Sequence, residues 1–371
     1  MKSKHIYKSI ACGVLLALTA TSCDLDYNPV DSYSDVTEGV DKTDEKPIFN
    51  SVQDVETSMV TLHKKFRDQQ EHWYVDKLLI GDAHSDNAYA GTTGAEVVPY
   101  ETNSIEGSNS VLKRDWDRFL GDIAEANRII VGCEQLKALS DSERGKYQSQ
   151  AKIFRAMVMF DMVRLWGNFP VITTVGGDIT EDNVEEMYPT YFPPQNTAEE
   201  AYAQIEKDLT EAVENPNTPT NDASDKSILT KSVARAMLAK VYAEKPLRDY
   251  AKVIKYADEL AADGFDLVED FSDLWAYDTE KKDCRVRNTK EAILEAHFPP
   301  GSGNWCTWMF GRNLSNWDES FTWAKWITPS RDLIRLYEEQ GDTKRYNESV
   351  VWYECGWSNY YPADHYAFMY K

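Results

Sequence analysis

The segment Ala151–Ile172, AKIFRAMVMFDMVRLWGNFPVI, constrains the fold more than any other part of this chain. Its apolar residues recur at steps of three and four, which places them on one face of a helix. Gly167 and Asn168 tolerate the left-handed backbone that ends helices, and Pro170 prevents the helix from resuming. Helical patterns lie on both sides, so we expect a buried helix at the centre of the fold. Its expected buried face is Tyr147, Ala151, Phe154, Val158, Met162 and Leu165.

Amphipathic patterns predict further helices before and after this segment. They cover Ser51–Gln69, Asp115–Leu139, Ser142–Leu165, Thr230–Glu244, Asp249–Asp263 and Pro329–Gln340. Another helix begins at Thr197, an N-cap with Glu200 three residues on, and Pro216 ends it. The helices before and after Glu244 are expected to form a hairpin of the tetratricopeptide-like kind. In that hairpin, Ala234, Leu238 and Val241 are expected to face Ala251, Ile254, Ala257 and Leu260.

The remaining stretches lack a helical period. GDAHSDNAYAGTTGAE (81–96) and the segment from Pro170 to Pro194 are expected to be loops. Glu291–Phe298 alternates as a strand does, and Val350–Tyr370 is extended and aromatic. The stretch 301–326 is rich in Gly, Asn, Ser and Trp, and seven of the eleven tryptophans follow residue 300. We therefore predict a mainly α fold with minor β, in which an irregular aromatic part follows the helices.

The N-terminus predicts export. Lys2, Lys4 and Lys8 precede the apolar run Ile10–Ala20, which is shorter than the ~20 residues that a membrane span needs. Such a run is typical of a signal peptide, here residues 1–22. Cys23 follows small residues, as the acylated cysteine of a lipoprotein does; the alternative is ordinary secretory cleavage beside an uninvolved cysteine. Residues 23–50 are expected to be the anchor and an acidic tether.

Charge and cysteine content narrow the possible partners. Without residues 1–22, the chain has 37 basic and 62 acidic residues, a net charge of −25. This balance argues against nucleic-acid binding and against attachment to anionic membranes by a basic patch. The cysteines Cys133, Cys284, Cys306 and Cys355 are widely spaced without a CxxC pair. They either form disulfides in an exported protein or serve as small buried apolar residues.

Four stretches, taken in chain order, resemble the SusD/RagB family of Bacteroidetes outer-membrane lipoproteins. They are CDLDYNP at the lipoprotein start, the loop HSDNAYAG, the helix pair WDRFLGDIAEANRII with RAMVMFDMVRLWGNFPVI, and the hairpin TKSVARAMLAKVYAEK with DYAKVIKYADELAADGF. The resemblance implies a scaffold of tetratricopeptide-like helical pairs over 51–264, with inserted loops, and an irregular ligand-binding part over 265–371. Family members continue into one more helical pair, so the chain is expected to lack the family's last pair.

The same resemblance implies a function in nutrient uptake and polysaccharide utilisation. By this resemblance, the chain is expected to be a surface-exposed lipoprotein of the cell outer membrane, held there only by its lipid (palmitate) anchor on Cys23. Such a protein captures an oligosaccharide and delivers it to a SusC-like TonB-dependent transporter. Neither a cofactor nor a metal is implied.

Two regions offer the chemistry that sugars require. Pyranose rings present C–H faces that stack on aromatic side chains, while amides and carboxylates bind the hydroxyl groups. The first region carries Trp305, Trp308, Asn313 and Trp317; alternatively, its tryptophans form a local core. The second carries Asp86 and Asn87 as hydroxyl partners and Tyr89 as a stacking platform; alternatively, the first two residues form a turn by bonding their own backbone.

Two other functions remain open. A glycoside hydrolase needs two carboxylates ~5–10 Å apart, one with a raised pKa, and no acidic pair stands out in the sequence. The histidines show no HExxH or comparable metal spacing, and GxSxG and Walker motifs are missing from the sequence. A helical-repeat scaffold that binds only peptide or protein would account for the hairpins. It would leave the tryptophan-rich end unexplained.

Overall fold

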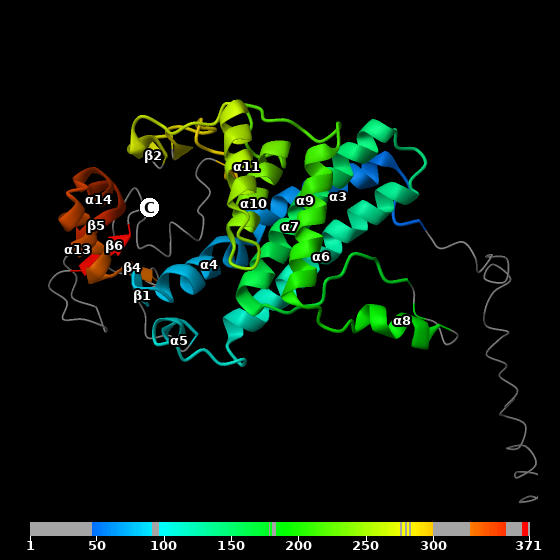
Figure 1. Cartoon of the computed structure of the whole chain (residues 1–371), viewed down its shortest axis with the longest axis horizontal. Helices are drawn as coiled ribbons and strands as arrows, with labels where there is room; N and C mark the ends of the chain where they lie inside the picture. Colours follow the sequence, from blue (N-terminus) through cyan, green and yellow to red (C-terminus); the bar gives the residue numbers. More distant parts are fainter. Residues whose placement is uncertain are drawn as a thin grey trace, which may run out of the picture. The chain divides into compact units, whose positions relative to one another are not determined.

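The computed structural model describes residues 47–90, 96–177, 179, 183–274, 277–278, 280–281, 283–299, 327–353 and 366–369 (Figure 1). The chain divides into residues 1–46 and a unit of residues 47–371, and every described residue belongs to the second. The predicted signal peptide and Cys23 therefore lie outside the described residues.

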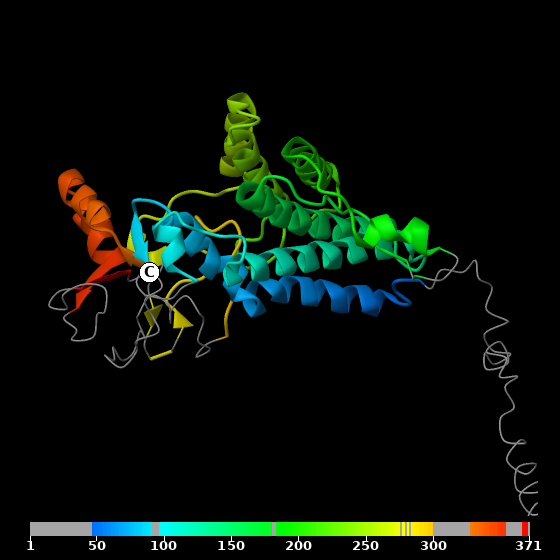
Figure 2. The same cartoon turned by 90° about the horizontal axis from the view of Figure 1, so that it is seen from below.

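A row of long helices forms the body of this unit. The helices are α3 (Val52–Asp68), α6 (Ser110–Gln135), α7 (Asp141–Trp166), α9 (Ala198–Glu214), α10 (Lys231–Ala243) and α11 (Tyr250–Ala262). Each packs on the next in this order, and Figure 2 shows α3, α6 and α7 running side by side. The mainly α fold predicted from the sequence is confirmed.

Shorter elements complete the described part. The helical ones are the π-helical turns η2 (Glu71–Val75) and η3 (Leu79–Ala83), the 3-10 turn η4 (Phe271–Leu274), and α4 (Asp76–Leu78), α5 (Val98–Glu101), α8 (Val184–Tyr191), α13 (Arg331–Gln340) and α14 (Thr343–Ser349). The strands form antiparallel pairs: β1 (Ala88–Ala90) with β4 (Ile327–Pro329), β2 (Tyr277–Asp278) with β3 (Asp283–Cys284), and β5 (Val350–Tyr353) with β6 (Tyr366–Met369).

Helix α7 occupies the centre of the row, as its sequence predicts. Its N-cap Ser140 and Glu143 form a capping box, in which each side chain binds the other residue's backbone N–H. The helix ends at Trp166, where Gly167 takes the positive φ of 73° that glycine tolerates. All the residues predicted for its inner face are buried except Leu165, which is half-buried. Other faces are buried too, because α6 and α9 pack on opposite flanks.

A separate small core lies beneath β1. Its buried apolar residues are Leu79, Ala83, Ala88, Ala90, Val97, Tyr100, Val111 and Ile327. These residues come from the segment between α3 and α6, from the start of α6 and from β4, so this core joins β4 to a segment more than 200 residues earlier in the chain. Ala88 and Ala90 of β1 are packed in this core, so the strand that follows Asp86 and Asn87 is held in place.

The structure corrects several predictions from the sequence. The expected loop from Pro170 to Pro194 contains the helix α8, and the expected loop 81–96 contains β1. Glu291–Phe298 forms no strand. In the hairpin of α10 and α11, Ala251, Ile254 and Ala257 are exposed, and the ring of the buried Tyr256 lies 6.1 Å from that of Tyr242 instead.

Two of the cysteines lie in the described part, and both are free thiols. Cys133 is buried, and burial raises the pKa of its thiol to about 12. Cys133 thus fits the prediction of a small buried residue, whereas Cys284 is exposed and does not. Cys306 and Cys355 lie outside the described residues.

Candidate ligand-binding site

The predicted site residues Asp86, Asn87 and Tyr89 lie at the edge formed by β1 and β4. Here Ala88 pairs with Pro329 and Ala90 pairs with Ile327. We call residues 86–90 and 327–331 the β1–β4 edge. The pairing continues one residue past β4, because the backbone N–H of Ser330 donates to the carbonyl of Asn87 over 2.9 Å. The turn that carries Asp86 and Asn87 is therefore fixed by a strand from the far end of the chain.

The hydroxyl of Ser330 holds this turn against α13. It donates to the carbonyl oxygen of Asp86 over 2.5 Å and accepts from the backbone N–H of Leu333 over 3.0 Å. Ser330 is thus the N-cap of α13 as well as the support of the turn. Its side chain is buried, so both bonds are shielded from water.

The side chains of Asp86 and Asn87 take no part in these contacts. Both residues are exposed, and neither side chain hydrogen bonds to another residue of the described part. The alternative, in which the side chains of Asp86 and Asn87 bond to their own backbone, is not observed. The side chain of Ser85 makes such bonds in this turn instead. Its hydroxyl accepts from the backbone N–H of Asn87 over 3.2 Å and donates to the carbonyl of Asp82 over 2.8 Å. The carboxylate and amide at the turn are therefore available to bind hydroxyl groups.

The half-buried Tyr89 contributes an aromatic ring to the same edge. Its hydroxyl accepts from the backbone N–H of Arg331 over 3.4 Å. On the next residue, the backbone N–H of Ala90 donates to the carboxylate of Glu101 over 2.8 Å, which fixes the strand from the side of α5. The edge thus presents a tyrosine and two exposed polar side chains on a well-braced backbone.

Trp305, Trp308, Asn313 and Trp317 lie outside the described residues. The chain that carries them nevertheless starts and ends at described points. Its far end is Ile327, which is buried and pairs with Ala90 of β1. The described chain thus resumes after this stretch at β4, the strand that pairs with β1.

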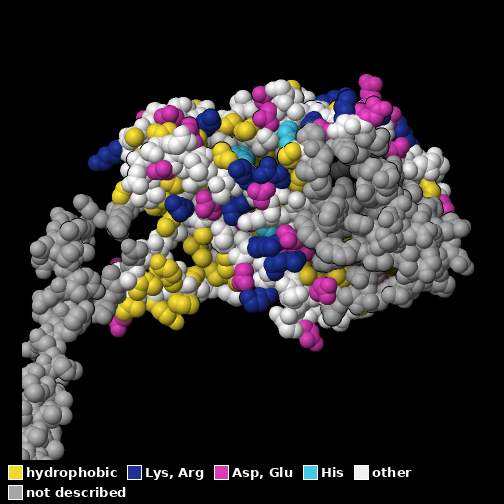
Figure 3. Space-filling view, turned by 180° about the vertical axis from the view of Figure 1, so that it is seen from behind, with side chains coloured by type: hydrophobic (Ala, Val, Ile, Leu, Met, Phe, Trp, Pro, Cys, Tyr) yellow, Lys and Arg dark blue, Asp and Glu magenta, His cyan; other side chains and the backbone are white. Residues whose placement is uncertain are grey.

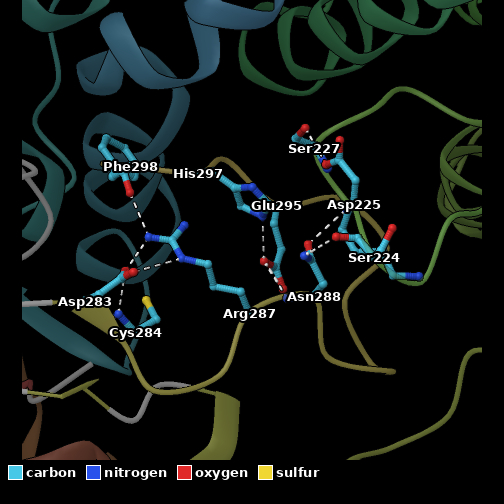
Figure 4. A network of polar contacts seen from close by, with 11 residues as sticks. Ser224, Asp225, Ser227, Asp283, Cys284, Arg287, Asn288, Glu295, His297 and Phe298 are labelled. Atoms are coloured by element: carbon cyan, nitrogen blue, oxygen red, sulfur yellow. Dashed lines mark hydrogen bonds and ion pairs between the residues drawn. The ribbon is translucent and has the colours of Figure 1, made fainter. Parts of the chain in front are cut away.

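The near end of the tryptophan-rich stretch is held by a polar network (Figure 4). Arg287 forms an ion pair with Asp283 and donates over 2.7 Å to the carbonyl oxygen of Phe298. Glu295 accepts from the backbone N–H of Asn288 over 3.0 Å, and its carboxylate lies 3.0 Å from Nε2 of His297. These contacts brace the chain immediately before the stretch begins.

The same network ties this segment to the loop before α10. The amide nitrogen of Asn288 donates to the carbonyl of Ser224 over 2.7 Å, and its amide oxygen accepts from the backbone N–H of Lys226 over 3.0 Å. Asn288 has a φ of 55°, a left-handed conformation that asparagine adopts more readily than most residues. The side chain of Asn288 therefore joins two irregular segments by bonding to the backbone of the loop before α10.

Two carboxylates of the network, Asp283 and Asp225, have a pKa below the ordinary value of 3.8. A hydrogen bond from Arg287 lowers the pKa of Asp283, and one from the Ser227 hydroxyl lowers the pKa of Asp225. By contrast, burial raises the pKa of Asp82, four residues before Asp86. Ionised carboxylates accept hydrogen bonds, so the network braces the chain by charge-assisted bonds.

Within the described ranges, no group of three or more His, Cys, Asp or Glu side chains is placed to hold a metal ion. None of the helices in those ranges combines the length and the apolar character of a membrane span.

Sequence reasoning missed Ser330 and Glu101, which support the edge without facing a ligand. Ser330 precedes a helical pattern and so carries the signal of an N-cap. Its bond to Asp86 spans 244 residues of chain, however, and nothing in the local sequence marks it.

Comparison with known proteins identifies a family whose model matches more than half of the chain. Residues 31–243 match the model of a SusD-like family described as starch-binding and associating with the outer membrane. A SusD-like protein of Bacteroides ovatus is 25% identical over 318 residues, which are 82% of this chain and 51% of the relative. The chain thus spans about half the length of the curated relative that it matches.

Solved structures share the fold. A SusD superfamily protein from Bacteroides vulgatus matches with a TM-score of 0.66 at 16% identity, over 86% of this chain and 68% of that one. A laminarin-binding SusD-like protein matches with a TM-score of 0.62 at 17% identity, over 87% of this chain and 72% of the other.

Proposed function

Since the chain belongs to the SusD-like family, we propose that it captures an oligosaccharide at the cell surface and delivers it to a SusC-like TonB-dependent transporter. The observation that carries this proposal is the family match over more than half of the chain. The family's description names starch binding, and one solved relative of the same fold binds laminarin. The ligand class that we propose is therefore a glucan or a related glycan.

The β1–β4 edge supplies local support for a glycan site. Asp86 and Asn87 offer an acceptor and a donor on an exposed turn, and hydroxyl groups need both. Tyr89 offers a ring on which a pyranose face would stack. We propose that Trp305, Trp308, Asn313 and Trp317 extend the same site, because their stretch precedes β4, the strand that pairs with β1.

The proposed mechanism is capture without bond cleavage. Binding raises the local concentration of the glycan, and its transfer to the barrel then depends only on relative affinity. We propose that Cys23 carries the lipid that holds the protein at the outer membrane. With a net charge of −25 after loss of residues 1–22, the protein gains nothing from anionic lipid headgroups, so the anchor carries the attachment alone.

The test is isothermal titration calorimetry of the mature chain with soluble starch and laminarin oligosaccharides, xylan fragments and peptides. Saturable heat with at least one glycan is expected. Heat with peptides alone would instead support the helical scaffold that binds only peptide or protein. Sustained release of reducing ends by the purified protein would show that it is a glycoside hydrolase.

Delivery and anchoring have separate tests. Co-purification of a SusC-like barrel with the tagged protein is expected, and its failure would remove the delivery step while leaving glycan capture intact. Cys23→Ala is expected to release the protein from membranes. If this variant stays in the membrane fraction, lipidation at Cys23 is wrong.

A further inference from the structure

A group of exposed apolar side chains lies on and beside α8. We define the α8 surface as Val175, Ile179, Val184, Tyr188, Tyr191 and Phe192, all of which are exposed. Figure 3 shows hydrophobic side chains gathered at this end of the molecule. Tyr188 is 57% and Phe192 is 67% exposed, and α8 itself has no buried residue. Single exposed apolar residues are common, but a cluster of this kind marks an interaction site.

The aromatic residues of the α8 surface are already held in place. The rings of Tyr188 and Phe192 stack with centroids 4.8 Å apart and an interplanar angle of 29°. The hydroxyl of Tyr191 donates to the carbonyl of Gly177 over 2.6 Å, and its ring packs closely on Gly176. Rings fixed in this way lose little conformational entropy when they bind, so the surface is prepared for a partner.

The charge around the α8 surface indicates what kind of partner fits it. Residues 175–192, which span the α8 surface, contain five acidic residues and neither lysine nor arginine. Glu185 and Glu186, on α8 itself, are exposed. A second copy of the chain would bring the same negative charges, and an anionic lipid surface would repel them. A positively charged rim on the partner would instead complement them.

We propose that the α8 surface docks a protein partner whose contact face has an apolar centre with lysine or arginine around it. Tyr188 and Phe192 act as the central anchors, since aromatic residues are enriched at protein interfaces and tyrosine is frequent among the few residues that dominate binding energy. Glu185 and Glu186 steer the basic rim and set the orientation. This docking goes beyond glycan capture, because the α8 surface shares no residue with the β1–β4 edge.

The test uses the full mature chain and two synthetic amphipathic helices as probes. Both have leucine and phenylalanine on one face; one carries lysine along both flanks, and the other carries glutamate at the same positions. Fluorescence anisotropy is expected to show binding of the lysine-flanked peptide at least about tenfold tighter than that of its glutamate twin.

Variants locate the binding. Replacing both anchors, Tyr188→Ser with Phe192→Ser, is expected to weaken binding of the lysine-flanked peptide at least about tenfold. The matched control replaces the exposed pair Tyr250 and Ile254 of α11 by serine, which should leave binding unchanged. Glu185→Lys with Glu186→Lys should reverse the preference between the two peptides.

Three results would overturn the proposal. The first is equal peptide binding by the wild type and the Tyr188→Ser/Phe192→Ser chain. The second is a concentration-dependent dimer, seen by sedimentation, that this double variant abolishes. The third is binding to phosphatidylglycerol vesicles through the same two rings. Glycan calorimetry on the double variant should match the wild type, so a failure here leaves the proposed glycan function untouched.

Discussion

The guanidinium of Arg155 and the carboxylate of Asp208 form a buried bidentate salt bridge. Nε and Nη2 of Arg155 donate to the two carboxylate oxygens over 2.8 and 2.7 Å, and both side chains are almost fully buried. Nη1 of Arg155 also donates to the amide oxygen of Asn127 over 2.7 Å. One side chain of α7 therefore joins α6 and α9, the helices packed on either flank.

Removing Asp208 should destabilise the protein severely. Asp208→Ala leaves the charge of Arg155 buried without its partner, and we expect a loss of about 3–5 kcal/mol in the free energy of unfolding. Urea unfolding followed by circular dichroism measures it. Glu211→Ala is the matched control, because Glu211 pairs with Lys152 on the exposed side of the same helices and should cost under about 1 kcal/mol. Similar losses for the two variants would show that the buried bridge holds nothing together.

A buried carboxyl pair should make stability fall as the pH rises. Burial, and then the neighbouring carboxylate of Asp76, raise the pKa of Asp115 to about 9, from an ordinary value of 3.8. Between these two pH values the folded state holds a proton that the unfolded state has lost, so stability decreases from pH 4 towards pH 9. An asparagine side chain in place of Asp115 would imitate the protonated acid and remove this dependence.

We therefore expect Asp115→Asn to gain stability relative to the wild type as the pH rises from 5 to 8. Urea unfolding at each pH measures the difference. Asp117→Asn, at an exposed position two residues along α6, is the control and should follow the wild-type curve. If Asp115→Asn and the wild type run parallel across this range, Asp115 does not hold a proton in the fold.

Two glycines of α6 should respond to alanine in opposite directions. A Cβ on Gly132 would lie 2.4 Å from the buried ring of Phe49, whereas one on Gly121 would meet nothing within 4 Å. Gly132→Ala should therefore cost about 1–3 kcal/mol through overpacking. Gly121→Ala should stabilise by about 0.5–1 kcal/mol, because alanine favours the helix. Thermal unfolding distinguishes the two, and a stabilising Gly132→Ala would contradict the packing of Phe49.

Ser330 links stability to the proposed site. Ser330→Ala removes the N-cap of α13 and the bond to Asp86, and should cost about 1–2 kcal/mol. It should also weaken glycan binding several-fold, since the turn that carries Asp86 is loosened. Ser140→Ala removes the N-cap of α7 and should lower stability without changing glycan affinity. Unchanged affinity in both variants would mean that the turn is not part of the site.

The sequence predicted the helices well because their signals are local. The end of α7 at Gly167 and the start of α9 at Thr197 follow from capping chemistry within a few residues. Helix α8 was missed because its aromatic residues face solvent and Pro189 lies inside it, so neither periodicity nor composition marks a helix there.

Other features depend on contacts between distant residues. Strand β1 has three residues, too few to show alternation, and it exists because β4 pairs with it from far along the chain. Periodicity predicts an apolar face for α11 but not which way that face turns. Ile254 was therefore expected to face α10, and it is exposed instead. Asp86, Asn87 and Tyr89 were predicted from their chemistry alone and remain a proposal, and the contact of their neighbour Ser330 appears only in the fold.

Calorimetry on the turn at the β1–β4 edge tests the central claim most directly. The mature wild type, the Asp86→Ala/Asn87→Ala double variant and an Asp258→Ala control, altered at an exposed residue of α11, are titrated with the same starch and laminarin oligosaccharides. We predict saturable binding by the wild type and the control, and at least about tenfold weaker binding by the double variant. Equal affinity in all three chains, or no glycan binding by the wild type, would contradict the account.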